Sequence, residues 1–211
     1  MLFLFDLDGT LIDSEIGILS GVRHSLAHVG ADIPDDTILR GWIGPPLRVS
    51  FGEVLGHDRH DLIEAAVTAY GERFRDVGWS EHTVYDGIPE TIAALEAAGH
   101  HLAIVTSKTR SHAERIIPHL PFGAAFHRVY APGPETAHSE KAEMIAAALA
   151  DFGHPKEDVV MIGDRRFDIE GAVANDVRGV GVLWGFGDRE ELERAGAWKT
   201  VGTPRELVGL A

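Results

Sequence analysis

The sequence has 211 residues, 45% of them hydrophobic and 25% charged, which is the balance of a globular protein long enough to bury a sizeable core. Its formal net charge of -14 at pH 7 argues against a nucleic acid polymer or an anionic membrane as a partner, because both favour a basic surface. The sequence contains no cysteine, which excludes disulfides and thiolate catalysis, and it shows neither a basic leader nor an apolar segment long enough to span a bilayer. We therefore expect a cytoplasmic protein.

The chain begins with an apolar run at residues 2–5 that predicts a strand buried on both faces. Asp6 and Asp8 follow, and in an extended backbone this spacing points both carboxylates to the same side. Gly9 then allows the chain to leave the strand, and Thr10 can cap the backbone beyond it. The pattern leaves two interpretations open: the acids form an ordinary turn at a strand end, or they belong to a functional site.

Residues 14–83 carry helical signals and no convincing strand. Apolar residues recur at helical spacing over 12–29 and again over 63–77. Weaker helical signals between these two stretches are broken by prolines and glycines. We therefore predict a small all-helical domain at 14–83.

From Tyr85 onward, expected strands alternate with expected helices. The strands are expected near 101–106, 126–130, 159–162, 179–183 and 198–201. The helices are expected near 88–99, 109–118, 139–152, 166–175 and after 188. This alternation predicts an α/β fold, a Rossmann-like parallel sheet wrapped by helices. Residues 1–13 and 84–211 would form this discontinuous core, and the inserted helical domain would lie beside the site as a cap.

Polar side chains follow three of the expected strands at the point where each strand ends. The three groups are Asp6 with Asp8, Thr106 with Ser107 and Lys108, and Asp164 with Asp168. Because ligands of parallel sheets bind at the carboxyl ends of the strands, we expect these groups to meet in one site. Several acids in one pocket repel each other, so such a cluster needs a divalent cation and a lysine.

At this point the sequence resembles a known family, the haloacid dehalogenase-like superfamily, and within it the phosphoglycolate phosphatase-like and nucleotidase-like branch. The residues that carry the resemblance are DLDGT at 6–10, Thr106-Ser107, Lys141 and GDRRFD at 163–168. The resemblance implies that Asp6 is a nucleophile that forms an aspartyl phosphate, and that Asp8 is first a general acid and then a general base. It also implies Mg²⁺, held by Asp6, the Asp8 backbone carbonyl, Asp164 and Asp168.

The same resemblance implies a phosphate site and a substrate class. Thr106 and Lys141 would contact phosphate oxygens and offset charge in the transition state. Gly9 and Ser107 would help to bind the substrate, which is expected to be a small phosphorylated metabolite. In this branch a helical cap is inserted after the first motif, as predicted above.

The roles of several cations stay open. Lys141 lacks the proline that often follows it in this branch, and Lys108 is a rival for the phosphate site. Arg165 and Arg166 stand where small hydroxyl residues are frequent, and they either contact substrate or form surface ion pairs. Arg48 occupies a cap stretch that faces the substrate in similar proteins, although an arginine on a helix is usually solvated.

Other conspicuous residues are interpreted as structural. His57 and His60 have the i, i+3 spacing of metal ligands, but no third ligand is evident nearby, so we expect them to be structural or on the surface. Packing is the expected role of the four tryptophans, Trp42, Trp79, Trp184 and Trp198.

The sequence therefore predicts a Mg²⁺-dependent phosphatase, a monomer or homodimer, that acts on a phosphoglycolate-like compound, a sugar phosphate or a nucleotide. One alternative is a phosphomutase, which shares the four motifs. Another is a non-enzymatic phosphoacceptor or binding domain. Asp8 argues against that alternative, and also against the dehalogenase branch, which does not carry this second acid.

Overall fold

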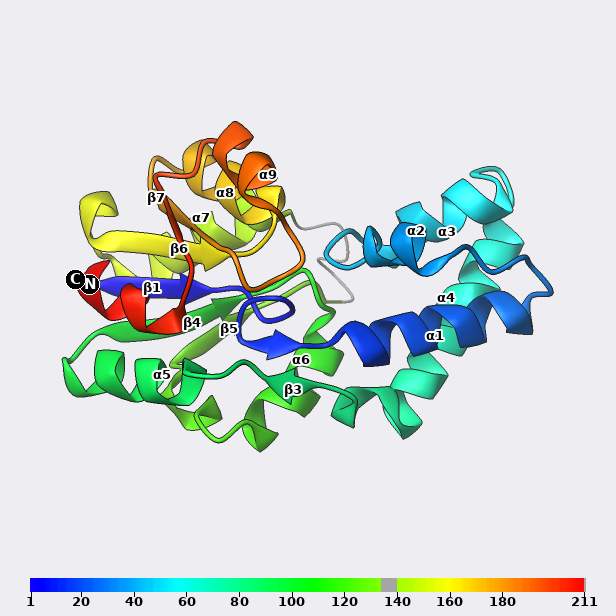
Figure 1. The fold of residues 1–211 in the computed structure, drawn as a ribbon, viewed down its shortest axis with the longest axis horizontal. Coiled ribbons are helices and arrows are strands. Elements are labelled where there is room, and N and C mark those ends of the chain that lie inside the picture. Colours follow the sequence, from blue (N-terminus) through cyan, green and yellow to red (C-terminus); the bar gives the residue numbers. More distant parts are fainter. Residues whose placement is uncertain (134–139, 211) are drawn as a thin grey trace. The chain divides into compact units, whose positions relative to one another are not determined.

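The computed structural model describes residues 1–133 and 140–210 (Figure 1). The chain divides into two compact units. Unit 1 comprises Met1–Asp13 and Val84–Ala211, and unit 2 comprises Ser14–Thr83. No helix in the described ranges is both long and apolar enough to cross a membrane.

In the part of the chain that the structure describes, unit 1 contains a six-stranded parallel sheet in the order β5-β4-β1-β6-β7-β8 (Figure 1). Its strands are β1 Leu2–Phe5, β4 His101–Val105, β5 Arg128–Tyr130, β6 Val159–Gly163, β7 Arg178–Val182 and β8 Lys199–Val201. Strand β1 lies in the middle, with Leu2 in register with His101 on one side and with Val159 on the other. The predicted parallel sheet is confirmed, including its short strand near the C-terminus.

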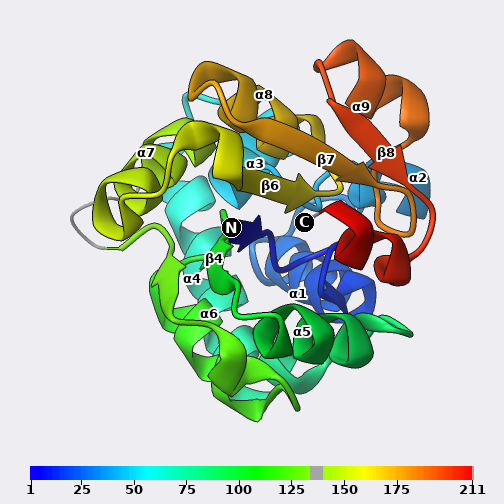
Figure 2. The same ribbon diagram turned by 90° about the vertical axis from the view of Figure 1, so that its left-hand side faces the viewer.

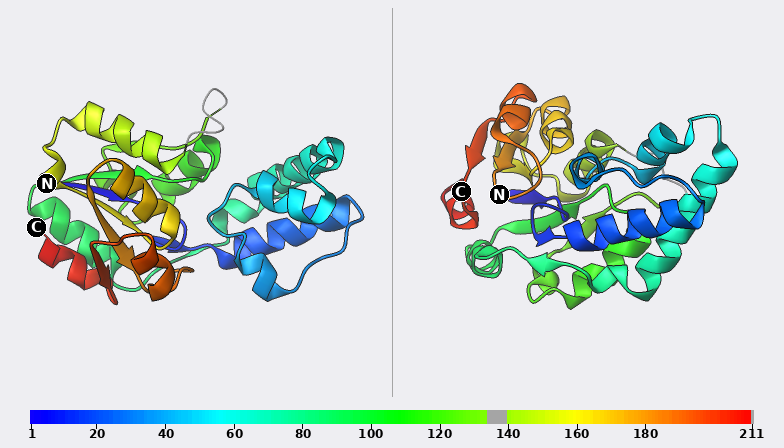
Figure 3. Two further views of the ribbon diagram at one scale, coloured as in Figure 1. Left: turned by 90° about the horizontal axis from the view of Figure 1, so that it is seen from above. Right: turned by 45° about the vertical axis from the view of Figure 1, so that its right-hand side comes forward.

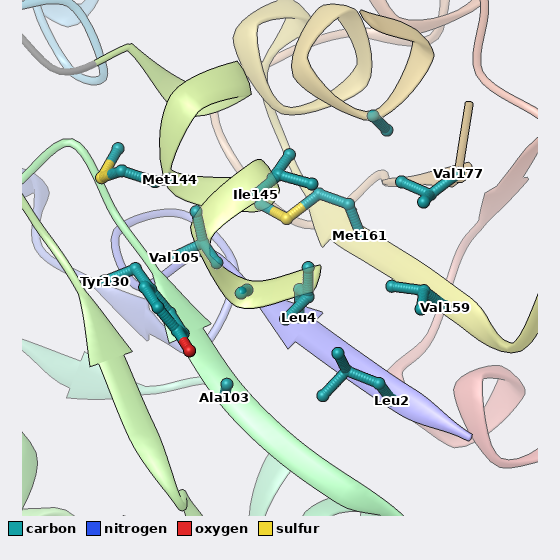
Figure 4. Close-up of a cluster of buried hydrophobic side chains, with 12 residues drawn as sticks. Leu2, Leu4, Ala103, Val105, Tyr130, Met144, Ile145, Val159, Met161 and Val177 are labelled. Atoms are coloured by element: carbon teal, nitrogen blue, oxygen red, sulfur yellow. The ribbon is translucent and has the colours of Figure 1, made fainter. Parts of the chain in front are cut away.

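Helices cover both faces of this sheet (Figure 2). They are α5 Ile88–Ala97, α6 Arg110–Ile116, α7 Lys141–Phe152, α8 Arg166–Ala174 and α9 Arg189–Arg194, with a 3-10 segment at Pro204–Leu210. Alternation along β1 sends Leu2 and Leu4 to the face that α7 and α8 cover, where Ile145 belongs to the same buried cluster (Figure 4). Phe3 and Phe5 stack on each other on the opposite face. Burial on both faces explains why β1 is a continuous apolar run.

Residues 14–83, all of which the structure describes, form four α-helices (Figure 3). They are α1 Glu15–His28, α2 Asp36–Arg40, α3 Leu47–Leu55 and α4 His60–Asp76. Helices α1 and α4 pack closely, since a Cβ placed at Gly21 would lie only 2.6 Å from the ring of Tyr70. The apolar stripe of α4, which includes Ile63 and Phe74, is buried in this packing.

The predicted boundaries differ from the structure in a few places. Strand β2, Ile12–Asp13, pairs with β3, Thr83–Val84, where the chain leaves and re-enters unit 1. The helix predicted from residue 12 therefore begins only at Glu15, because Ile12 is in a strand. Two-residue strands have no periodicity to detect, which is why the sequence did not predict them. The helix predicted at 139–152 corresponds to α7, Lys141–Phe152, and its predicted first residue, Ser139, lies outside the described residues.

Candidate active site

The loop after β1 is built so that it can approach the end of β6. The Asp6 N–H donates to the Ile162 carbonyl at 2.9 Å and so extends the sheet by one residue. The chain then turns at Gly9, which has a φ of +79°. A Cβ at Gly9 would lie 2.2 Å from Asp164 Oδ2, so only glycine allows this approach.

Three carboxylates converge there. Asp6, Asp164 and Asp168 each bring one oxygen to within 4.8 Å of the others, and this is the one such group among the described residues. Their residues are 7%, 0% and 1% exposed, and they come from the ends of β1 and β6 and from the first turn of α8. Like charges this close and this buried disfavour ionisation.

Two of these carboxyls, Asp6 and Asp164, have raised pKa values. Burial raises the pKa of the Asp6 carboxyl to about 7; Lys141 opposes this, and Asp168 and Asp8 add to it. Burial, together with the charges of Asp168 and Asp6, raises the pKa of Asp164 well above its ordinary value. Binding of a cation here would therefore favour loss of the protons from Asp6 and Asp164.

Lys141, the first residue of α7, lies inside the acid cluster. Its Nζ is 2.8 Å from Asp6 Oδ1 and 2.7 Å from Asp168 Oδ1, and it donates to the Val105 carbonyl at 2.7 Å. Burial works against the charged ammonium, but Asp168 and Asp6 outweigh it, so the pKa of Lys141 lies above its usual value. The Lys141 side chain is only 5% exposed, so this lysine belongs to the interior of the site and not to the solvated surface.

The donor set fits a magnesium ion. Three buried carboxylates offer hard oxygen ligands, which Mg²⁺ prefers, and one lysine does not balance their charge. Burial and then the charges of neighbouring acids raise the pKa values of Asp6 and Asp164, and a divalent cation would stabilise their ionised forms.

Lys108 contacts the other acid of the first motif. Its Nζ lies 3.1 Å from Asp8 Oδ2, and the two side chains are 7% and 12% exposed. The other oxygen, Asp8 Oδ1, is buried and accepts no hydrogen bond from the described residues. His112 lies close to this pair, and burial followed by the charge of Lys108 lowers the pKa of its imidazole to about 4, although Asp8 opposes this. The two lysines that the sequence left as rivals thus serve different acids.

Thr106 and Ser107 follow β4. Thr106 is buried, and its N–H donates to the Tyr130 carbonyl at 3.0 Å, so its position is fixed by the sheet. Its hydroxyl oxygen accepts the Lys108 N–H at 3.2 Å, which leaves the hydroxyl proton able to donate to a ligand. Ser107 is half-buried next to it.

Arg165 and Arg166 both pair with acids of the protein itself. Arg165 Nε lies 2.9 Å from Glu191, and Arg166 Nη1 lies 3.1 Å from Glu170 one helical turn away. Arg166 is half-exposed, as expected for a surface pair, whereas Arg165 is largely buried. The Arg165 backbone N–H also donates to Asp168 Oδ2 at 3.1 Å, which helps to orient that carboxylate.

In unit 2, Arg48 forms a bidentate ion pair with Glu64. Its Nε and Nη2 donate to the two carboxylate oxygens at 2.7 and 2.8 Å, and both side chains are about half exposed. The pairing joins α3 to α4. His57 and His60 belong to no cluster of three candidate ligands in the described ranges.

Sequence reasoning missed one part of the site, the loop after β7. Trp184 Nε1 donates to the Thr10 carbonyl at 3.0 Å, so this tryptophan, for which only packing was expected, has a polar partner. The Phe186 N–H donates to Asp164 Oδ2 at 2.8 Å. The available signal was a pair of glycines at 185 and 187, on either side of an aromatic residue, directly after a strand.

A family model described as haloacid dehalogenase-like hydrolase matches residues 3–182. The chain belongs to this family. A 5'-nucleotidase from Pseudomonas aeruginosa is 42% identical over 189 residues, covering 90% of this chain and 85% of that protein. The tyrosine-protein kinase PtkA from Mycobacterium tuberculosis is 34% identical over 215 residues, covering 99% of this chain and 72% of that protein.

The solved structures agree with the family assignment. A protein from Clostridium acetobutylicum described as a predicted phosphatase matches with a TM-score of 0.90 and 35% identity, covering 99% of this chain and 96% of that one. Several bacterial phosphoglycolate phosphatases are similar at 26–28% identity. These similarities place the chain among the phosphoric monoester hydrolases of the haloacid dehalogenase-like family, in its phosphoglycolate phosphatase-like branch.

Proposed function

We propose that this protein is a Mg²⁺-dependent phosphatase that hydrolyses a small phosphate monoester through an aspartyl-phosphate intermediate. One observation carries the proposal: Asp6 is a buried carboxylate at the end of the central strand, with Lys141 on one oxygen and two further acids beside it. Buried acids with raised pKa values that lie close to further acids and a lysine are typical of functional sites.

Asp6 is proposed as the nucleophile. Its Oδ1 accepts the Leu7 N–H at 2.8 Å and pairs with Lys141, so this oxygen is held in place. The other oxygen, Oδ2, can attack phosphorus, which forms the bond from Asp6 to the phosphoryl group while the bond to the leaving alcohol breaks. Water then attacks the same phosphorus, the acyl phosphate bond breaks, and inorganic phosphate leaves.

Asp8 is proposed as the general acid and base. It donates a proton to the leaving oxygen in the first step and takes one from the attacking water in the second. Its contact with Lys108 at 3.1 Å holds Oδ2, while the buried Oδ1 has no partner among the described residues and can face the reacting oxygen.

The remaining residues would bind the phosphoryl group and the metal. The Thr106 hydroxyl and the Lys141 ammonium can donate to phosphate oxygens, with the Gly9 and Ser107 backbone beside them. Asp6, Asp164 and Asp168, with the Asp8 carbonyl, would hold Mg²⁺. When bound, Mg²⁺ neutralises the acids and draws charge from the phosphoryl oxygens.

Unit 2 is proposed as the cap that selects the substrate. The similarity to a 5'-nucleotidase and to phosphoglycolate phosphatases makes nucleoside monophosphates and phosphoglycolate the first compounds to test. Arg48 is a candidate for contact with the part of the substrate away from the phosphate. In that role it would exchange its ion pair with Glu64 for a ligand.

The decisive experiment is a phosphate-release screen over phosphoglycolate, sugar phosphates, nucleoside monophosphates and phosphotyrosine. Asp6→Asn serves as the blank, and Asp13→Asn, in the same stretch of sequence, is the matched control. We expect Asp13→Asn to keep its turnover and Asp6→Asn to lose it while remaining folded. Turnover by Asp6→Asn close to that of the wild type would refute the nucleophilic role.

The same screen separates the alternatives. A phosphomutase would need a bisphosphate activator and release little phosphate, and a phosphoacceptor domain would hold a long-lived acyl phosphate without turnover. Because one relative is named a tyrosine-protein kinase, ATP labelled at the γ-phosphate should also be offered. Label found on tyrosine instead of in free phosphate would contradict the hydrolase proposal.

A further inference from the structure

The segment Trp184–Gly187 lies directly after β7 and reaches the loops that end β1 and β6. Its hydrogen bonds form a closed path around Asp164. The Phe186 N–H donates to Asp164 Oδ2 at 2.8 Å, and the Thr10 hydroxyl donates to Asp164 Oδ1 at 3.3 Å. Trp184 Nε1 in turn donates to the carbonyl of Thr10 at 3.0 Å. Both oxygens of one buried carboxylate are therefore oriented by this segment, one directly and one through Thr10.

The two glycines of the segment are required by this close packing. A Cβ at Gly187 would lie 2.0 Å from the Asp164 carbonyl oxygen, which belongs to backbone and cannot rotate away. A Cβ at Gly185 would lie 2.3 Å from the Gly9 carbonyl oxygen and 2.4 Å from Asp164 Cβ. Any larger residue would push the segment away from Asp164 and lengthen the hydrogen bond from Phe186.

We propose that Trp184–Gly187 is a positioning element that fixes the Asp164 carboxylate for metal binding. This inference rests on the proposed function, because it takes Asp164 as a Mg²⁺ ligand. Groups that hydrogen-bond to metal ligands fix their orientation, and losing them typically weakens metal affinity by about 10- to 100-fold. The segment contributes through a backbone N–H, an indole N–H and the absence of two side chains, so no titratable residue marks it in the sequence.

Two matched pairs of variants test the proposal. Gly187→Ala introduces the clash with Asp164, whereas Gly202→Ala is its control, because a Cβ at Gly202 would lie 3.7 Å from its nearest contact. Phe186→Pro removes the N–H that donates to Asp164, whereas Phe186→Ala removes the ring and keeps that N–H. Mg²⁺ affinity is measured by isothermal titration calorimetry on the full chain, with thermal unfolding in EDTA as a check of folding.

We expect Gly187→Ala and Phe186→Pro to bind Mg²⁺ about 10- to 100-fold more weakly, with Gly202→Ala and Phe186→Ala unchanged. Their activity should recover at saturating Mg²⁺, which a purely structural defect would not allow. If Gly187→Ala or Phe186→Pro does not fold, Trp184→Phe takes its place, because it keeps an aromatic ring but removes the hydrogen bond to the Thr10 carbonyl. Trp198→Phe is then the control.

Asp164→Asn separates this inference from the proposed function. Weak Mg²⁺ binding by Asp164→Asn with normal binding by the Trp184–Gly187 variants would overturn the positioning role alone. Normal Mg²⁺ binding by Asp164→Asn would overturn the metal site of the proposed function, and the positioning role with it.

Discussion

Replacing His112 with leucine should make the protein more resistant to acid. His112 lies in α6 beside the Lys108–Asp8 pair, where burial and then Lys108 lower the pKa of its imidazole from 6.5 to about 4. Between these two values the unfolded chain binds a proton at this residue that the folded protein does not bind. The free energy of unfolding therefore falls as the pH drops through this window, and the contribution is complete above about pH 6.5.

The magnitude follows from the two pKa values. A difference from 6.5 to about 4 corresponds to about 3 kcal/mol, and allowing for partial exposure of the imidazole leaves about 2 kcal/mol. Asp6 acts in the opposite direction, because its raised pKa means that the folded state binds the extra proton between its ordinary value and about 7. Only the difference between variant and wild type isolates His112, since Asp6 contributes equally to both.

Urea unfolding in EDTA, at several values between about pH 7.5 and about pH 4.5, measures this difference. We expect His112→Leu to lose about 2 kcal/mol less than the wild type over that range. His28→Leu, at the exposed end of α1, is the control and should follow the wild type. If the His112→Leu and wild-type curves run parallel, the imidazole does not stay neutral in the folded state and the reasoning is refuted.

Four further outcomes are expected. Lys141→Met should lower the free energy of unfolding by about 3–5 kcal/mol at neutral pH, because two buried carboxylates lose their partner. Lys156 forms an exposed ion pair, and Lys156→Met should lower the same free energy by under about 1 kcal/mol. Asp8→Asn should reduce kcat by about 10²- to 10⁴-fold while a phosphoenzyme can still be trapped; an unchanged kcat would remove Asp8 from proton transfer. EDTA should abolish activity and Mg²⁺ should restore it, and activity that resists chelation would contradict the metal site. The affinity for Mg²⁺ should rise as the pH increases through about 7, since Asp6 must lose its proton to bind the cation. Arg48→Ala should raise KM for some substrates of the panel and not for others. If its KM and kcat equal those of the wild type for every substrate, Arg48 does not contact the substrate.

The sequence predicted the sheet because its strands are buried on both faces and are therefore continuous apolar runs. Strand β1 is the clearest case, with its four residues fully buried. The long helices α1 and α4 were also predicted, because each has one buried face whose apolar residues recur at helical spacing. The β2–β3 pair was not predicted, since two residues carry no pattern and their pairing depends on where the inserted unit rejoins the chain.

The acids of the site were predicted from their positions at strand ends, but the partners of the cations were not. Arg48 pairs with Glu64 across two helices, which no short-range spacing reveals. The segment Trp184–Gly187 escaped notice for another reason. It acts through a backbone N–H and through space that a Cβ would fill, and neither property belongs to a residue type that sequence reasoning treats as chemical.

The two lysines pair with different acids, which explains how one pocket can hold several carboxylates and still accept a phosphate. Lys141 pairs with Asp6 and Asp168, and Lys108 pairs with Asp8. Together with Asp164, four carboxylates of the described residues therefore lie near two ammonium groups. When all four carboxylates are ionised, the excess of two negative charges matches one divalent cation. A phosphate monoester then enters a pocket that is close to neutral, whereas without the cation it would be repelled by the ionised carboxylates. Metal binding is therefore expected to precede substrate binding, because each lysine is already engaged and neither can supply the missing charge.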